Sequence, residues 1–151
     1  MTATDVARRL EFTALGRPQP GGSKRSFQAK TGQTIVKEDN PKAKPWQAVI
    51  AAAADDAMNG DELLTGPLFL EAIFYLARPA GHFGTGRNHN ILKPSSPRYP
   101  TVRPDATKLL RAIEDALTGV AWRDDAQIVI QLARKRYGTP ERAEILIAEV
   151  A

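Results

Sequence analysis

The chain has 151 residues, a net charge of +4 at pH 7 and no cysteine. This length suits a single domain over residues 1–151, because a chain of about 150 residues buries roughly two-thirds of its surface around one core. The missing cysteines exclude disulfide bridges, thiolate zinc sites and cysteine nucleophiles, and no apolar run approaches the roughly 20 residues of a membrane-spanning helix.

The first part of the chain predicts two strands joined by a basic loop. Residues 10–15 alternate apolar with polar side chains, which is typical of a half-buried strand. Two prolines and two glycines within residues 17–26 then indicate a flexible segment, and we expect a basic loop over about residues 16–32. A second strand is predicted near residues 33–37.

A helix and a central strand are predicted next. The alanine-rich run from 46 to 58 has high helix propensity, with Pro45 near its first turn and Asn59, followed by glycine, at its end. Residues 68–77 are apolar on both faces apart from Glu71, which indicates a central strand covered on two sides.

The second half of the chain predicts a long basic loop, a helix and two strands. Residues 78–103 contain four prolines, three glycines and no apolar period, and a loop of that length is usually functional or disordered. Residues 104–118 place their apolar side chains on one helical stripe, with Gly119 as the stop signal. Strands are predicted at 127–133 and 143–150, joined as a hairpin. This order predicts an α/β or α+β fold, with a mixed sheet packed against two main helices.

The basic residues gather in two stretches that contain no acid. Residues 12–37 hold five bases and residues 72–104 hold five more, whereas carboxylates gather between Asp105 and Asp125. Cations that flank an acidic centre favour a polyanion as partner, although basic loops also serve solubility alone. The first ten residues lack the apolar core of a signal peptide, so a cytoplasmic location is expected.

Four residues form a candidate centre for phosphodiester chemistry: Asp105, Arg111, Asp124 and Asp125. Asp105 opens the second predicted helix, and the aspartate pair lies in the turn before the next strand, so these carboxylates converge if that strand packs beside the start of the helix. Converging carboxylates are ligands for Mg²⁺, and Arg111 is then suited to stabilise charge on a phosphate. Each residue also has an ordinary interpretation: Asp105 as an N-cap, the pair as turn residues, and Arg111 as the i,i+4 partner of Asp115.

Residues 103–128, RPDATKLLRAIEDALTGVAWRDDAQI, resemble the signature of RusA-type crossover-junction endodeoxyribonucleases, phage and prophage members included. That signature runs Pro-Asp-x-Asp-[Asn or Lys]-Leu-x-[Lys or Arg], then Asp-Ala-Leu-x-Gly, then Asp-Asp-x-Gln. A dozen residues match it in order: Pro104, Asp105, Lys108, Leu109, Arg111, Asp115, Ala116, Leu117, Gly119, Asp124, Asp125 and Gln127. The segment GRPQPGGSKR and the long loop resemble the family more loosely.

The resemblance implies a homodimer that binds four-way (Holliday) DNA junctions and cuts them with Mg²⁺ or Mn²⁺. It implies metal-binding positions at Asp105 and Asp125, and a functional cation at Arg111, where the family carries lysine. Asp124 matches the adjacent acid, and we expect it to lie at the metal with the other two aspartates. On this interpretation eight cations contact the DNA: Arg17, Lys24, Arg25, Arg87, Lys93, Arg98, Arg103 and Lys108.

One position departs from the family's pattern. The second aspartate, two residues after the first, is Thr107 in this chain. Its loss removes a ligand where a divalent cation is expected, so metal affinity falls, the ligands are redistributed, or catalysis is lost while DNA binding remains. The alternatives to an enzyme are a non-catalytic protein that binds branched DNA and, less specifically, an interaction module.

Other residues have structural interpretations. His82 and His89 have six residues between them, unlike zinc pairs, and are expected in solvent or at a phosphate. The glycines of the long loop lack the lysine-serine or lysine-threonine of a P-loop, so no nucleotide cofactor is expected. Trp46 and Trp122 are expected to pack in the core.

Overall fold

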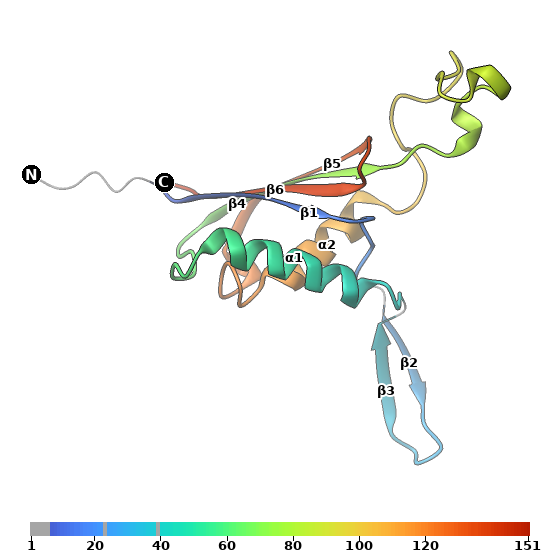
Figure 1. Ribbon diagram of the computed structural model, residues 1–151. Helices are drawn as coiled ribbons and strands as arrows, with labels where there is room; N and C mark the ends of the chain where they lie inside the picture. The colour runs from blue at the N-terminus through green and yellow to red at the C-terminus, as the bar shows by residue number, and fades with distance from the viewer. Residues whose placement is uncertain (1–6, 23, 39) are drawn as a thin grey trace, which may run out of the picture.

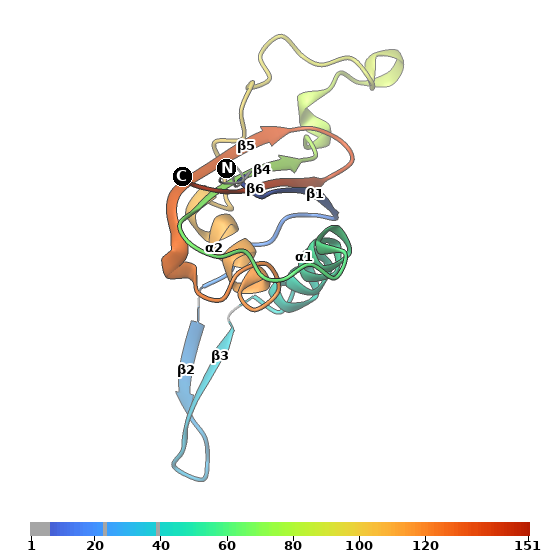
Figure 2. The same ribbon diagram turned by 90° about the vertical axis from the view of Figure 1, so that its left-hand side faces the viewer.

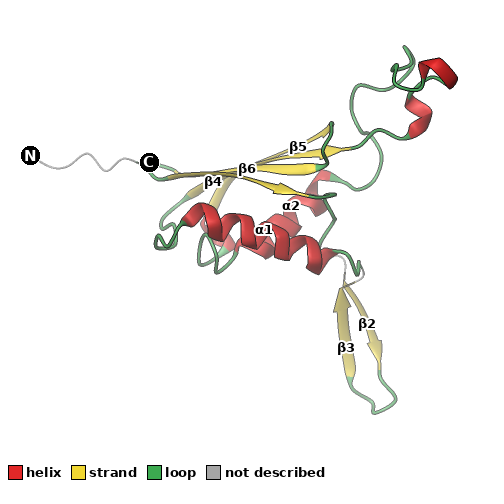
Figure 3. Ribbon diagram, viewed as in Figure 1, coloured by secondary structure: helices red, strands yellow, loops and turns green. Residues whose placement is uncertain are grey.

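The computed structural model describes residues 7–22, 24–38 and 40–151. Four strands form one mixed sheet in the order β1-β6-β4-β5, and two more form a separate hairpin (Figures 1 and 3). The elements are β1 (Arg9–Leu15), β2 (Lys24–Gln28), β3 (Thr34–Glu38), α1 (Ala43–Met58), β4 (Leu68–Leu76), η1 (Ala80–His82), η2 (Gly86–Asn88), α2 (Ala106–Leu117), η3 (Asp125–Gln127), β5 (Ile128–Tyr137) and β6 (Arg142–Glu149). One mixed sheet and two main helices confirm the predicted α+β fold.

The central strand of the sheet is β4. It pairs in parallel with β5 and antiparallel with β6, so it separates these two strands. The predicted hairpin between residues 127–133 and 143–150 is therefore wrong. The connection crosses the end of β4 instead, where Gly138 donates its N–H to the carbonyl oxygen of Leu76 at 3.0 Å.

Both helices lie on one face of the sheet (Figures 1 and 2). The side chains of β4 alternate between buried and partly exposed along its whole length. Its buried set, Leu68, Leu70, Ala72, Phe74 and Leu76, faces the helices. The prediction that both faces of this strand are covered is wrong within one chain. The alternate residues of β4 lie on the other face of the sheet, and no helix or strand of the described residues covers that face.

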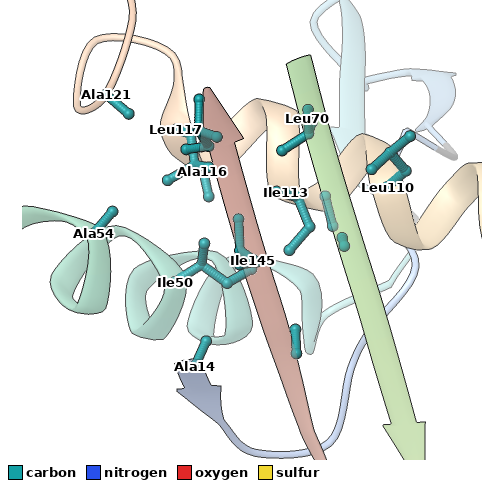
Figure 4. Packing of buried hydrophobic residues seen from close by; sticks show 14 of the residues in the cluster. Ala14, Ile50, Ala54, Leu70, Leu110, Ile113, Ala116, Leu117, Ala121 and Ile145 are labelled. Carbon is teal, nitrogen blue, oxygen red and sulfur yellow. The ribbon is translucent and has the colours of Figure 1, made fainter. Parts of the chain in front are cut away.

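The core lies between this face and the two helices (Figure 4). In α1, Trp46, Ile50 and Ala54 recur every four residues and are buried, as expected for one face of a helix. The helix starts before Pro45, which the first turn tolerates because its amide would lack a helical partner there. In α2 the predicted apolar stripe is buried, and the opposite side of the helix is exposed.

The segment predicted as a basic loop over residues 16–32 contains a strand. Within it β2 pairs with β3, from Lys24 opposite Glu38 to Gln28 opposite Thr34. The resulting hairpin extends outward from the side of the molecule on which the helices lie, in both views (Figures 1 and 2). Lys24 and Arg25 therefore lie on an extended arm.

The long loop over residues 78–103 projects on the opposite side of the molecule (Figure 1). The Arg78 guanidinium lies 4.4 Å from the centre of the Tyr137 ring, and Arg78 Nη1 donates to the carbonyl oxygen of Pro97 at 2.7 Å. Lys135 Nζ donates to the carbonyl oxygen of Val102 at 2.6 Å. These contacts fix both ends of the loop to β5 and to each other. In the part of the chain that the structure describes, no helix is long and apolar enough to cross a membrane.

Candidate active site

Asp125 lies at the C-terminal end of α2, where two side chains hold its carboxylate. Thr118, which follows the last turn of α2, donates from Oγ1 to Asp125 Oδ1 at 2.5 Å, and the indole Nε1 of Trp122 donates to the same oxygen at 3.0 Å. Trp122 is fully buried, as expected for a packing residue. Among residues 7–22, 24–38 and 40–151, no hydrogen bond reaches Oδ2, so this oxygen is available to a ligand.

Asp124 has a different environment from its neighbour. Its Oδ1 accepts a hydrogen bond from the backbone N–H of Ala126 at 2.8 Å, and the Gln127 side chain accepts one from the backbone N–H of Asp124 at 3.0 Å. This reciprocal pair is a capping box for η3. Asp124 thus serves as the turn residue that its structural interpretation expects, and its role at a metal stays a prediction.

Two further residues of the signature build the turn that carries Asp125. Gly119 has φ 85°, a left-handed conformation that favours glycine, and its N–H donates to the carbonyl oxygen of Trp122 at 2.7 Å. Gln127 Nε2 donates to the carbonyl oxygens of Leu64 at 3.2 Å and Gly66 at 3.1 Å. The turn is therefore fixed both to the end of α2 and to the segment that leads into β4.

Glu114 is a second carboxylate beside Asp125 that the sequence did not single out. It lies on the same face of α2 as Arg111 and Thr118, at i−3 and i+4, and this spacing was the available signal. Burial raises the pKa of Glu114, and the negative charges of Asp125 and then Asp115 raise it further, against the opposing effects of Arg111 and Gln131. Gln131 donates a hydrogen bond to Glu114 Oε1.

At the other end of α2, Asp105 occupies the N-cap position but makes no capping hydrogen bond with its side chain. Its exposed carboxylate lines a cavity of about 640 Å³ between the base of the hairpin and the returning end of the long loop. Four cations also line this cavity: Arg17, Lys42, Arg103 and Lys108. The sequence missed Lys42, because it lies outside the acid-free stretches.

The structure separates Asp105 from Asp125. The helix between them has 12 residues, which corresponds to about 18 Å at 1.5 Å per residue. The expectation that these carboxylates converge is therefore wrong for a single chain, because the strand after Asp125 packs beside the far end of the helix. Within the described ranges, no three carboxylate or imidazole groups lie close enough to hold a metal ion.

Arg111 lies midway along α2, on its exposed side. The segment that leads to the hairpin packs directly on this part of the helix, and Gly21 donates its N–H to the carbonyl oxygen of Lys108 at 2.9 Å. Gly22 has φ 81°, and a Cβ there would collide with Arg111 Cδ. The glycine pair thus allows the chain to pass close to Arg111.

The remaining predicted DNA contacts lie on the two projecting arms. Lys24 and Arg25 are in β2, whereas Arg87, Lys93 and Arg98 are exposed residues of the long loop. Two histidines of the same loop were expected in solvent or at a phosphate. His89 is exposed, whereas the half-buried His82 ring packs edge-on against Tyr137 at 5.3 Å between centroids.

The cations that line the cavity beside Asp105, together with the basic residues of the hairpin and of the long loop, suit a polyanion as ligand. The family model described as Endodeoxyribonuclease RusA matches residues 16–148. The chain belongs to this RusA endodeoxyribonuclease family, and family membership implies the activity of a Holliday-junction resolvase that binds branched DNA. The chain is also 25% identical over 142 residues to an uncharacterized protein of Bacillus subtilis (strain 168), YqaN, across 94% of this chain and 97% of that protein.

Proposed function

We propose that the protein is a metal-dependent Holliday-junction endonuclease that acts as a homodimer and uses Mg²⁺, with Mn²⁺ as a substitute. The observation that carries the proposal is the state of two carboxylates at family positions. Asp105 makes no capping hydrogen bond, and Asp125 keeps one oxygen free of hydrogen bonds from the described residues. An aspartate at an N-cap usually accepts a hydrogen bond from the start of its helix, as Asp124 does for η3 and Asp105 does not for α2.

These residues fit a hard divalent cation. Mg²⁺ prefers carboxylate oxygens and keeps several waters, and when bound it activates a water and stabilises the leaving oxygen of a phosphodiester. Asp105 and Asp125 would hold it, with Asp124 as the adjacent acid. Burial raises the pKa of Glu114, and the negative charges of Asp125 and Asp115 raise it further; a cation at Asp125 would relieve the repulsion between these charges.

The separation of the two carboxylates supports the proposed dimer. Asp105 and Asp125 lie at opposite ends of α2, so a metal site that contains both requires two chains. A two-fold dimer with antiparallel α2 helices would bring Asp105 of each chain to Asp125 of the other. Two-fold symmetry also suits a four-way junction, in which two strands are cut symmetrically.

Arg111 would stabilise the charge that develops on the reacting phosphate. Its guanidinium is a permanent cation that binds two phosphate oxygens at once, but it cannot donate a proton as lysine can. We therefore infer an electrostatic role for Arg111 without proton transfer. The cations of the Asp105 cavity and of the two arms would hold the flanking backbone, since phosphate contacts dominate DNA affinity.

A second candidate is a non-catalytic protein that binds branched DNA. Thr107 favours it, because this exposed residue stands where the family carries its second aspartate. Both candidates are expected to bind the four-way junction, but only the first should cleave it. A labelled four-way junction and a matched duplex, incubated with Mg²⁺, Mn²⁺ or EDTA, separate them. Metal-dependent paired nicks that Asp125→Asn abolishes support the enzyme, whereas tight junction binding without nicks supports the second candidate.

The dimer has its own test, in which two inactive variants are mixed. If each site takes Asp105 from one chain and Asp125 from the other, a heterodimer of Asp105→Asn and Asp125→Asn chains has one intact site and one doubly altered site. Random mixing should then restore about a quarter of the wild-type sites. A mixture that stays inactive, from variants shown to exchange chains, would mean that the site does not span two chains.

A further inference from the structure

We propose that Thr118 and Trp122 are positioning residues that orient Asp125 for metal binding, an inference that rests on the proposed metal-dependent function. Thr118 Oγ1 and Trp122 Nε1 both donate to Asp125 Oδ1, at 2.5 and 3.0 Å. Two donors on one oxygen fix the rotation of the carboxylate, so its second oxygen is presented in one direction. Outer partners of this kind orient metal ligands and commonly govern metal affinity.

The Thr118 hydroxyl has one proton and two acceptors within reach. The carbonyl oxygen of Glu114 lies at 2.9 Å, one helical turn back, and Asp125 Oδ1 lies at 2.5 Å. An ionised carboxylate is the stronger acceptor, so the proton goes to Asp125 rather than back to the helix. The hydroxyl is therefore used to hold a carboxylate, although its position at the end of α2 offers an ordinary local bond.

The two tryptophans of the chain provide an internal comparison. Both are buried, with Trp46 4% exposed and Trp122 0% exposed. In the described part of the chain, Trp46 Nε1 has no hydrogen-bond partner, whereas Trp122 Nε1 binds Asp125. A tryptophan can thus pack in this core without a hydrogen bond from its indole N–H. At Trp122 it has a specific partner, and that partner is the carboxylate at a metal-binding family position.

The test measures metal affinity and cleavage in matched variants. Thr118→Val removes the hydroxyl from an exposed site with little change in shape, Thr118→Ser retains it, and Trp122→Phe removes the N–H. Trp46→Phe is the matched control, since it truncates a buried tryptophan whose N–H has no partner among the described residues. Mn²⁺ affinity is measured by electron paramagnetic resonance, and the Mg²⁺ dependence of junction nicking is measured beside it.

We expect Thr118→Val and Trp122→Phe each to weaken Mn²⁺ binding about tenfold, the lower end of the usual range for such outer partners. The Mg²⁺ midpoint for nicking should rise in parallel, and junction binding in EDTA should not change. Thr118→Ser should restore wild-type metal affinity, and Trp46→Phe should leave it unaltered whatever its effect on thermal stability.

Wild-type Mn²⁺ affinity in both Thr118→Val and Trp122→Phe would overturn the proposal. Asp125→Asn distinguishes this failure from failure of the proposed function. If Asp125→Asn weakens metal binding while the two positioning variants do not, only the positioning role is wrong. If Asp125→Asn also binds Mn²⁺ normally, or if the wild type binds none, the metal-dependent function is wrong and the positioning role falls with it.

Discussion

The carboxylates at the two ends of α2 differ in exposure and in hydrogen bonding. At the N-terminal end, Asp105 is exposed, makes no capping hydrogen bond and lines a cavity with four cations. At the C-terminal end, Asp125 is half-buried and held by a buried indole and a hydroxyl. One end is a carboxylate in a positive field that suits a phosphate ligand, and the other is a carboxylate on a rigid support. In the proposed dimer, the same helix would supply two unlike halves of a site.

Removing either carboxylate should have the largest effect on nicking. The two variants should differ in thermal stability. Asp105→Ala and Asp125→Ala should each reduce nicking roughly 1,000-fold, because a bound metal supplies several kcal/mol of transition-state stabilisation. Asp125→Ala should also cost about 1–3 kcal/mol of stability, since it leaves the buried Trp122 N–H without its partner. Asp105→Ala should change the melting temperature little. Thermal melts and single-turnover cleavage measure both, with exposed Asp61→Ala as the control; equal melting temperatures for the two variants would contradict the comparison.

Thr107→Asp should make the N-terminal end a stronger metal half-site. It restores a carboxylate two residues after Asp105, in the first turn of α2, where negative charge also suits the helix dipole. We expect the Mg²⁺ concentration for half-maximal nicking to fall about tenfold, because affinity for such cations follows ligand charge. Thr107→Asn, which is similar in size but neutral, is the control. An unchanged Mg²⁺ midpoint would mean that the site is organised without position 107.

The cations of the Asp105 cavity should affect binding rather than chemistry. Each phosphate contact contributes about 0.9 to the slope of log affinity against log salt, so Lys42→Ala with Lys108→Ala should lower that slope by about 2. Affinity for the junction should fall several-fold at moderate salt. Arg9→Ala is the control for the loss of a single surface cation away from the cavity, since Arg9 lies on β1 and pairs with Glu11 at 2.6 Å. Titrations at four salt concentrations give the slopes, and parallel lines for all variants would remove the cavity from the DNA interface.

Sequence patterns predicted the local elements of this fold and missed its long-range pairings. The alternation in β1 and the apolar stripe of α2 depend on periodicity, which is readable along the chain. The insertion of β4 between β5 and β6, and the pairing of β2 with β3, depend on partners distant in sequence. The local pattern of a strand does not specify which distant strand it pairs with. The prolines and glycines of residues 17–26 also predicted a loop where β2 begins.

The candidate site shows the same division. The signature gave the positions of Asp105 and Asp125, but their separation depends on where the turn after α2 packs. Glu114 and Thr118 escaped notice because each is unremarkable on an exposed helical face, and only the return of Asp125 to that face gives them a role. Trp122 was expected to pack, and it does. Its second role, through Nε1, depends on a turn whose geometry comes from Gly119 and Gln127.

Glu114→Gln should have the smallest effect and should test the charge at the C-terminal end. The pKa of Glu114 is raised above its ordinary value of 4.5 by burial and by Asp125 and Asp115. The folded state therefore holds this proton more tightly than the unfolded state, so the contribution of Glu114 to stability is fully present below pH 4.5 and is lost as pH rises through the raised pKa. At pH 7–8 in EDTA, Glu114→Gln should be more stable than the wild type.

The gain should not exceed about 2 °C in melting temperature, because the side chain is partly exposed and solvent screens its charge. It should vanish near pH 4, where the wild-type carboxyl is protonated, and exposed Glu62→Gln should show neither effect. Mg²⁺ should reduce or reverse the gain, since a cation at Asp125 relieves the same repulsion in the wild type. Melts between pH 4 and 8, with and without Mg²⁺, measure these differences. A glutamine variant that is less stable at pH 7–8 without metal would show that the C-terminal end of α2 carries no excess of negative charge.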